Sequence, residues 1–136
     1  MSGARRRRAS VVLALAAALA YGSWAVFCNW GHGASAAVRA GGAQAVLSFS
    51  STFAMARIAD WLFRLGRTPV QGLILGIVCA VLLMFGLMYG VHATMGTRSI
   101  LATIAPSLLV GSVFITLYVF TAYASATRGA EIEGGA

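Results

Sequence analysis

Residues 69–91 read PVQGLILGIVCAVLLMFGLMYGV and include no charged side chain. A helix of about 20 apolar residues matches the hydrocarbon thickness of a lipid bilayer. Because the bilayer interior holds no water, every backbone N–H and C=O must be paired within the protein, and a helix pairs them all. The segment therefore predicts a membrane-spanning helix.

Three further segments could span a membrane beside it. Residues 9–30 and 99–126 are mostly apolar, whereas residues 36–56 mix alanine and glycine with serines, a glutamine and an arginine. We expect this second helix to continue to residue 65 as a cytoplasmic amphipathic turn. The 136 residues are 60% hydrophobic and 10% charged, and four spans use most of that length. The prediction is one all-α domain, residues 1–136, forming a polytopic membrane protein with a four-transmembrane-helix bundle.

The arginines predict how this bundle is oriented. Four arginines at residues 5–8 precede the first segment, three lie between the second and third, and Arg128 follows the fourth. Only Arg39 and Arg98 fall on the other side. Short loops rich in arginine stay in the cytoplasm, so both termini should be cytoplasmic in a bacterial inner membrane. Anionic lipid headgroups are the expected partners. Nucleic acid is not, because no aromatic residues alternate with the arginines.

The first segment has a second interpretation as a signal sequence. Ala18-Leu19-Ala20 resembles a cleavage site for residues 1–20, but the apolar run continues through Trp24 to Trp30. We favour an uncleaved anchor because this extra length suits a membrane span. Both interpretations leave the other three spans unchanged.

The third segment carries a stripe of small residues. Two GxxxG pairs lie fourteen residues apart, and with two residues between them they form two series with a spacing of seven, which places six positions on one side of a slightly supercoiled helix. These positions are Gly72, Gly76, Cys79, Leu83, Gly86 and Gly90. Small residues let membrane helices approach closely, so we expect helix packing at the four glycines. Packing within the bundle is the favoured interpretation, and a homodimer contact is the alternative.

The second segment carries a polar face. Gly41, Gln44, Ser48, Ser51 and Met55 recur at spacings of three and four, which gathers them on one side of a helix. We expect that side to point into the bundle. Its polar groups would either contact a ligand or, as we favour, hydrogen-bond across the bundle.

The two outer loops supply the other polar candidates. Asn29, His32 and Arg39 belong to the first loop, and His92 and Arg98 to the second. Arginine and histidine side chains bind phosphate oxygens, so these loops could hold an anion or a lipid headgroup. Simple solvation of the loops is the favoured alternative. The candidate ligand-binding residues are Asn29, His32, Arg39, Gln44, Ser48, His92 and Arg98.

The side chains offer little basis for catalysis. The three acids, Asp60, Glu131 and Glu133, all belong to the predicted cytoplasmic side, and no serine has the context of a nucleophile elbow. His32 and His92 lack the paired spacing and carboxylate ligand of common metal sites. We therefore expect no enzyme, no catalytic residue, no metal and no cofactor.

The strongest signals concern helix association rather than chemistry. They predict a small non-enzymatic inner-membrane protein that is an accessory or assembly subunit of a larger membrane complex. The alternative is a small carrier or binder of an anionic, neutral or lipid-like ligand, with the polar face of residues 36–56 as its contact surface.

Overall fold

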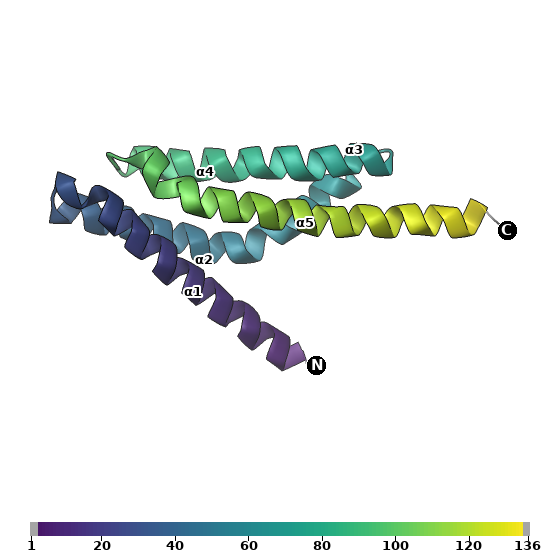
Figure 1. The fold of residues 1–136 in the computed structure, drawn as a ribbon, viewed down its shortest axis with the longest axis horizontal. Helices are drawn as coiled ribbons and strands as arrows, with labels where there is room; N and C mark the ends of the chain where they lie inside the picture. The colour runs from purple at the N-terminus through teal and green to yellow at the C-terminus, as the bar shows by residue number, and fades with distance from the viewer. Residues whose placement is uncertain (1–2, 135–136) are drawn as a thin grey trace.

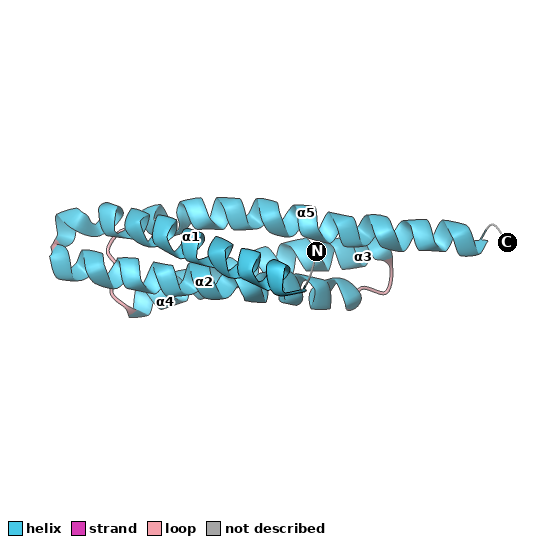
Figure 2. Cartoon of the chain, turned by 90° about the horizontal axis from the view of Figure 1, so that it is seen from below, coloured by secondary structure: helices cyan, strands magenta, loops and turns pink. Residues whose placement is uncertain are grey.

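The computed structural model describes residues 3–134, with side chains described for residues 11–128. The chain is all-α and forms four helical rods joined by short connections (Figure 2). The rods are α1 (Gly3–Asn29), α2 (Ala34–Arg64), a third rod made of α3 (Pro69–Ile74), η2 (Leu75–Cys79) and α4 (Ala80–Thr94), and α5 (Ile100–Gly134). A 3-10 turn, η1 (Trp30–His32), links α1 to α2. Short connections make successive rods antiparallel (Figure 1).

Three helices in the described part of the chain are long and apolar enough to cross a membrane. They are Val11–His32, Pro69–Thr94 and Ile100–Arg128. Large apolar side chains on them, such as Leu19, Leu82 and Leu117, are more than 60% exposed. Apolar surface of this extent is stable in lipid. The predicted all-α fold is thus confirmed, and three candidate spans are consistent with a multi-pass membrane protein; α2 is not among them.

The ends of the rods follow from local residues. Thr68 caps α3, since its hydroxyl oxygen accepts the backbone N–H of Gln71 at 3.2 Å, and Pro69 occupies the first turn. Gly33, between η1 and α2, and Gly96, between α4 and α5, have φ angles of 98° and 68°. This backbone conformation favours glycine. The fourth helix runs to Gly134, beyond the predicted boundary at residue 126, because alanine and glutamate in the tail are good helix formers.

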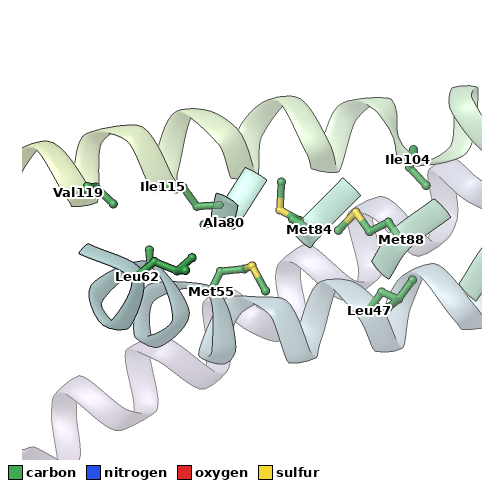
Figure 3. Close-up of a cluster of buried hydrophobic side chains, with 10 residues drawn as sticks. Leu47, Met55, Leu62, Ala80, Met84, Met88, Ile104, Ile115 and Val119 are labelled. Atoms are coloured by element: carbon green, nitrogen blue, oxygen red, sulfur yellow. The ribbon is translucent and has the colours of Figure 1, made fainter. Parts of the chain in front are cut away.

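The hydrophobic core lies between α2, α4 and α5 (Figure 3). It consists of Leu47, Met55, Ala59, Leu62, Ala80, Met84, Met88, Ile104, Ile115 and Val119. α1 contacts chiefly α2, where Gly22 and Gly41 allow a close approach: a Cβ on Gly22 would lie 3.1 Å from the Gly41 carbonyl oxygen. Toward its N-terminal end α1 diverges from the other helices (Figure 1).

The structure divides the predicted glycine stripe. A Cβ on Gly72 would lie 2.5 Å from the Phe63 carbonyl oxygen, and one on Gly76 would lie 2.9 Å from Val119, so both glycines pack inside the bundle. Gly86 and Gly90 are exposed, with nothing within 4 Å of an added Cβ.

The reason for this correction is the π-helical turn at Leu75–Cys79. Its i→i+5 hydrogen bonds add one residue to the turn, whereas the predicted stripe assumed an uninterrupted α-helix. The buried row after the turn is Ala80, Met84, Met88 and His92. Packing at Gly86 and Gly90 stays a prediction, now for contacts outside the chain.

The described ends of α1 and α5 lie at the same end of the bundle as the turn between α2 and α3 (Figure 1). The arginines of that turn and of the end of α5 therefore gather there, and the connections containing Gly33 and Gly96 lie at the opposite end. This arrangement is the one that the antiparallel four-rod prediction requires.

Candidate functional site

A buried hydrogen-bond network surrounds Gln44 of α2. Its side-chain oxygen lies 2.7 Å from His92 Nε2, and its Nε2 donates to Ser107 Oγ at 2.7 Å and to Ser48 Oγ at 3.3 Å. Gln44 and His92 are both 0% exposed. The network therefore joins α2, α4 and α5 through side chains that sit in the interior of the bundle.

The partners of His92 define its tautomer. The Gln44 oxygen only accepts, so His92 Nε2 carries a hydrogen and donates it. His92 Nδ1, 2.9 Å from Thr97 Oγ1, then accepts from the threonine hydroxyl in the neutral ring. The imidazole is thereby held on both sides, and its orientation is set by two different segments of the chain.

A second polar cluster lies around Asn29, at the end of the bundle that holds the α1–α2 and α4–α5 connections. Its Nδ2 donates to Thr103 Oγ1 at 2.8 Å and to the Ala25 carbonyl at 2.9 Å, and its Oδ1 accepts the backbone N–H of Ser99 at 3.2 Å. His32 Nε2 lies 3.2 Å from Ser99 Oγ. These bonds attach the end of α1 to the start of α5.

A third link between the same two helices involves a backbone carbonyl. Trp24 Nε1 donates to the Ala102 carbonyl oxygen at 2.8 Å, and Cys28 Sγ lies 3.8 Å from the same oxygen. Ala102 precedes Pro106 by four residues within α5. Proline has no N–H to give to that carbonyl, and the indole takes its place.

A cavity of about 310 Å³ lies between α1, α2, α4 and α5. Its lining is mostly apolar and, within residues 11–128, contains no charged side chain. The lining residues are Leu13, Ala17, Tyr21, Ser48, Ser51, Thr52, Met55, Met84, Met88, Ser107, Val110, Gly111 and Phe114. The cavity is partly open to its surroundings, and α1 diverges from the other helices toward its N-terminal end (Figure 1).

The hydroxyls that line the cavity differ in their partners. Thr52 donates to the Ser48 carbonyl at 2.8 Å, and Ser107 donates to the Ile104 carbonyl at 2.9 Å. Tyr21 and Ser51 make no side-chain hydrogen bond within residues 11–128. Ser48 and Ser107 belong both to the Gln44 network and to the cavity wall, so the network forms the polar side of the cavity.

The sequence-predicted site residues separate into three groups. Gln44, Ser48 and His92 come together in one network, with the predicted inward face of α2 confirmed by burial. Asn29 and His32 meet at Ser99 instead. The exposed Arg39 and Arg98 form no hydrogen bond or ion pair with the other described residues.

The proposed anion site at the outer loops is corrected accordingly. His92 is turned into the bundle rather than toward the loops, because the last turn of α4 continues the buried row that ends at this residue. Among residues 11–128, no group of three histidine, cysteine or acidic side chains could hold a metal ion.

Sequence reasoning missed the partners on α5 and the α1 side of the cavity. Thr103 and Ser107 are spaced by four within residues 100–111, the otherwise apolar first third of α5, a signal for a second polar face. Pro106 was also informative, because it marks a carbonyl that needs a donor. No comparable signal distinguishes Tyr21 from an ordinary interfacial tyrosine.

Comparison of the chain with protein-family models, with curated proteins and with solved structures finds no match. The cavity and its polar side chains are therefore the basis for assigning a function.

Proposed function

We propose that this chain is a small non-enzymatic membrane protein that holds a lipid-like ligand in the cavity between α1 and α5. The observation that carries the proposal is a 310 Å³ space lined by apolar side chains and a few hydroxyls. Ligand sites in proteins have volumes of roughly 300–1,000 Å³, are mostly apolar and contain a small number of polar groups. This cavity has each of these properties.

Its position favours a ligand that arrives from the bilayer. Leu13 on one side and Val110 and Phe114 on the other are each about half exposed or more, at 65%, 55% and 49%. Such side chains are stable against lipid tails rather than water. A molecule dissolved in the bilayer would reach the cavity between the two helices without crossing an aqueous layer.

The proposal includes α2 as a fourth span. Its polar side chains Gln44 and Ser48 are buried, while Val38 and Val46 on its outer side are 65% and 67% exposed. Arg39 has a stem long enough to reach a lipid phosphate at the membrane surface. Eight of the ten arginines then face the cytoplasm together with both termini, as expected for a bacterial inner-membrane protein.

The test fills the cavity with a larger side chain. Val110→Trp adds bulk at the lining, and Val113→Trp adds the same bulk at an equally exposed position of α5 outside it. Native mass spectrometry of protein released from bilayer nanodiscs should show a bound lipid that Val110→Trp loses and Val113→Trp keeps. Equal lipid occupancy in the two variants would exclude the cavity as the binding site.

A ligand carrier would show an additional property. Protein in liposomes should change the flux of a tracer lipid between leaflets. Gln44→Leu should reduce that change because it removes the hydrogen-bond partner that holds the lining hydroxyls of Ser48 and Ser107. Arg39→Ala tests whether the outer arginine contributes. If neither Gln44→Leu nor Arg39→Ala changes the flux, the protein would bind the ligand without transporting it.

A second candidate function is an accessory subunit of a larger membrane complex, or a homodimer. The observation that favours it is the exposed pair Gly86 and Gly90: a Cβ added at either would meet no atom of the described residues within 4 Å. Small residues on a lipid-facing helix allow another helix to approach closely. A native pull-down that yields one larger membrane protein in stoichiometric amount would support this role, and isolation as a monomer would exclude it.

A further inference from the structure

The depth of the cavity restricts which part of a lipid it can hold. Tyr21 and Leu13 precede Asn29, at the outer end of α1, by 8 and 16 residues. At about 1.5 Å per residue these positions lie roughly 12 and 24 Å along the helix. The hydrocarbon core of a bilayer is about 30 Å thick. Ser51 lies 17 residues beyond Ala34 at the start of α2, roughly 26 Å along that helix. The polar groups of the cavity are therefore spread over depths of roughly 12 to 26 Å within the hydrocarbon.

The lining also restricts the charge of the ligand. Among residues 11–128, no arginine, histidine or acidic residue lines the cavity, and the buried imidazole of His92 nearby has both ring nitrogens engaged, by Gln44 and Thr97. A charged group inside the membrane needs an opposite charge or water to be stable. A phosphate or carboxylate head would find neither among the lining side chains.

The hydroxyls specify the polar group further. Thr52 and Ser107 already donate their hydrogens to backbone carbonyls, and Ser48 and Ser107 accept from Gln44. The hydroxyl hydrogens of Tyr21, Ser48 and Ser51 have no acceptor among the described residues, and Tyr21 and Ser51 make no other side-chain hydrogen bond there. What the cavity lacks is an acceptor, and a carbonyl oxygen has two lone pairs to offer and no hydrogen of its own to place.

The remaining lining suits a variable apolar body. Met55, Met84 and Met88 surround the cavity together with Phe114. Methionine side chains are flexible and polarisable, and they adapt to both chains and rings. These side chains therefore disfavour a polar group in this part of the cavity, but they accept apolar groups of different shapes.

We infer that the ligand is an uncharged lipid whose polar end is a carbonyl oxygen, as in a prenylated quinone or a neutral glyceride ester. Carbonyl oxygens of the ligand accept hydrogen bonds from the Tyr21 hydroxyl at one depth and the Ser51 hydroxyl at another, and the apolar part lies along the methionines. This inference rests on the proposed function, since it names the class of molecule that the same cavity holds.

The experiment measures equilibrium binding of a radiolabelled benzoquinone with two isoprene units to the full chain in phosphatidylcholine nanodiscs. Tyr21→Phe and Ser51→Ala each remove one hydroxyl and little volume. Each should weaken binding by roughly three- to tenfold, the range for one hydrogen bond. Tyr118→Phe and Ser50→Ala are matched controls at exposed positions outside the lining, and should leave the Kd unchanged.

Competition identifies the ligand class. Unlabelled diacylglycerol has ester carbonyls, farnesol has a hydroxyl and no carbonyl, and phosphatidylglycerol has an anionic head. Displacement by quinone or diacylglycerol, with farnesol and phosphatidylglycerol weaker, supports the inference, and the stronger of the first two identifies the source of the carbonyl.

Two results would overturn it in distinguishable ways. Binding that Val110→Trp abolishes but that prefers phosphatidylglycerol or farnesol, or ignores Tyr21→Phe and Ser51→Ala, rejects the carbonyl class and leaves the proposed function standing. The absence of any lipid binding that is sensitive to Val110→Trp rejects both.

Discussion

Trp24 of α1 donates its indole N–H to the backbone carbonyl of Ala102 in α5 across 2.8 Å. In a regular helix that carbonyl would accept the N–H of residue 106, which is a proline. An unpaired carbonyl is costly in hydrocarbon because no water reaches it. The Trp24 indole therefore replaces the hydrogen bond that Pro106 cannot give to the Ala102 carbonyl. It also joins α1 to α5 at one end, while the two helices separate around the cavity.

Replacing Trp24 by phenylalanine should destabilise the protein because the Ala102 carbonyl loses its donor. The expected cost is about 1–3 kcal/mol, measured as the free energy of unfolding in detergent micelles. In a Pro106→Ala background residue 106 regains an N–H, so the same Trp24→Phe change should cost less. Trp61→Phe is the control, since Trp61 is exposed. Equal costs of Trp24→Phe in the two backgrounds would show that the indole bond does not compensate for the proline.

The Gln44 amide should hold His92 in the tautomer protonated at Nε2. This follows because the amide nitrogen donates to Ser107 and Ser48, which leaves only the amide oxygen to face the imidazole. Nitrogen-15 NMR of labelled histidine near neutral pH distinguishes the two neutral forms, with exposed His32 as an internal reference. A His92 ring protonated at Nδ1 alone would mean that the amide has the opposite orientation.

The contact between Gln44 and His92 should also appear in a double-mutant cycle. Gln44→Leu leaves the buried His92 donor without an acceptor, at a cost of about 1–3 kcal/mol. Adding His92→Leu removes the donor as well, so the double variant should be more stable than the sum of the single changes predicts. Additive effects would argue against a direct hydrogen bond between the two side chains.

Asn29 should contribute more to stability than His32, although both contact Ser99. Asn29 is fully buried and bonds to two helices, whereas His32 is exposed. Asn29→Ala should cost about 0.5–2 kcal/mol, and His32→Ala should stay within about 0.5 kcal/mol of the unmodified protein. Unfolding measurements that reverse this order would show that the outer cluster depends on the histidine.

The two halves of the glycine stripe should respond oppositely to alanine. Gly72→Ala places a Cβ 2.5 Å from the Phe63 carbonyl oxygen, and such overpacking costs about 1–3 kcal/mol. Gly86→Ala meets open space and should be neutral or stabilise the helix by up to about 1 kcal/mol.

Single cysteines in place of each of the four stripe glycines, Gly72, Gly76, Gly86 and Gly90, test whether the chain forms a homodimer. Crosslinks between subunits are expected only at Gly86 and Gly90, because Gly72 and Gly76 are covered by the chain itself. If no crosslink forms in membranes at any of the four positions, the homodimer is excluded, and Gly86 and Gly90 face lipid.

Several features were predictable because they depend on local sequence. Uncharged runs of spanning length predict the third rod, the cap at Thr68 marks its beginning, and the spacing of Gln44 and Ser48 correctly turns a polar face inward. The arginine distribution also agrees with a bundle whose described ends lie together (Figure 1). Each of these signals is read from neighbouring residues and from the period of a helix.

The pairing of polar groups was decided only by the tertiary structure. Gln44 meets His92 and Ser107 over separations of 48 and 63 residues, and those contacts depend on how each rod is rotated about its axis. The third rod is apolar on nearly every side, so its sequence does not define which side faces the bundle, and the π-helical turn at Leu75–Cys79 changes that side partway along. The cavity likewise exists because α1 diverges from α5, a property of the packing that no single segment contains.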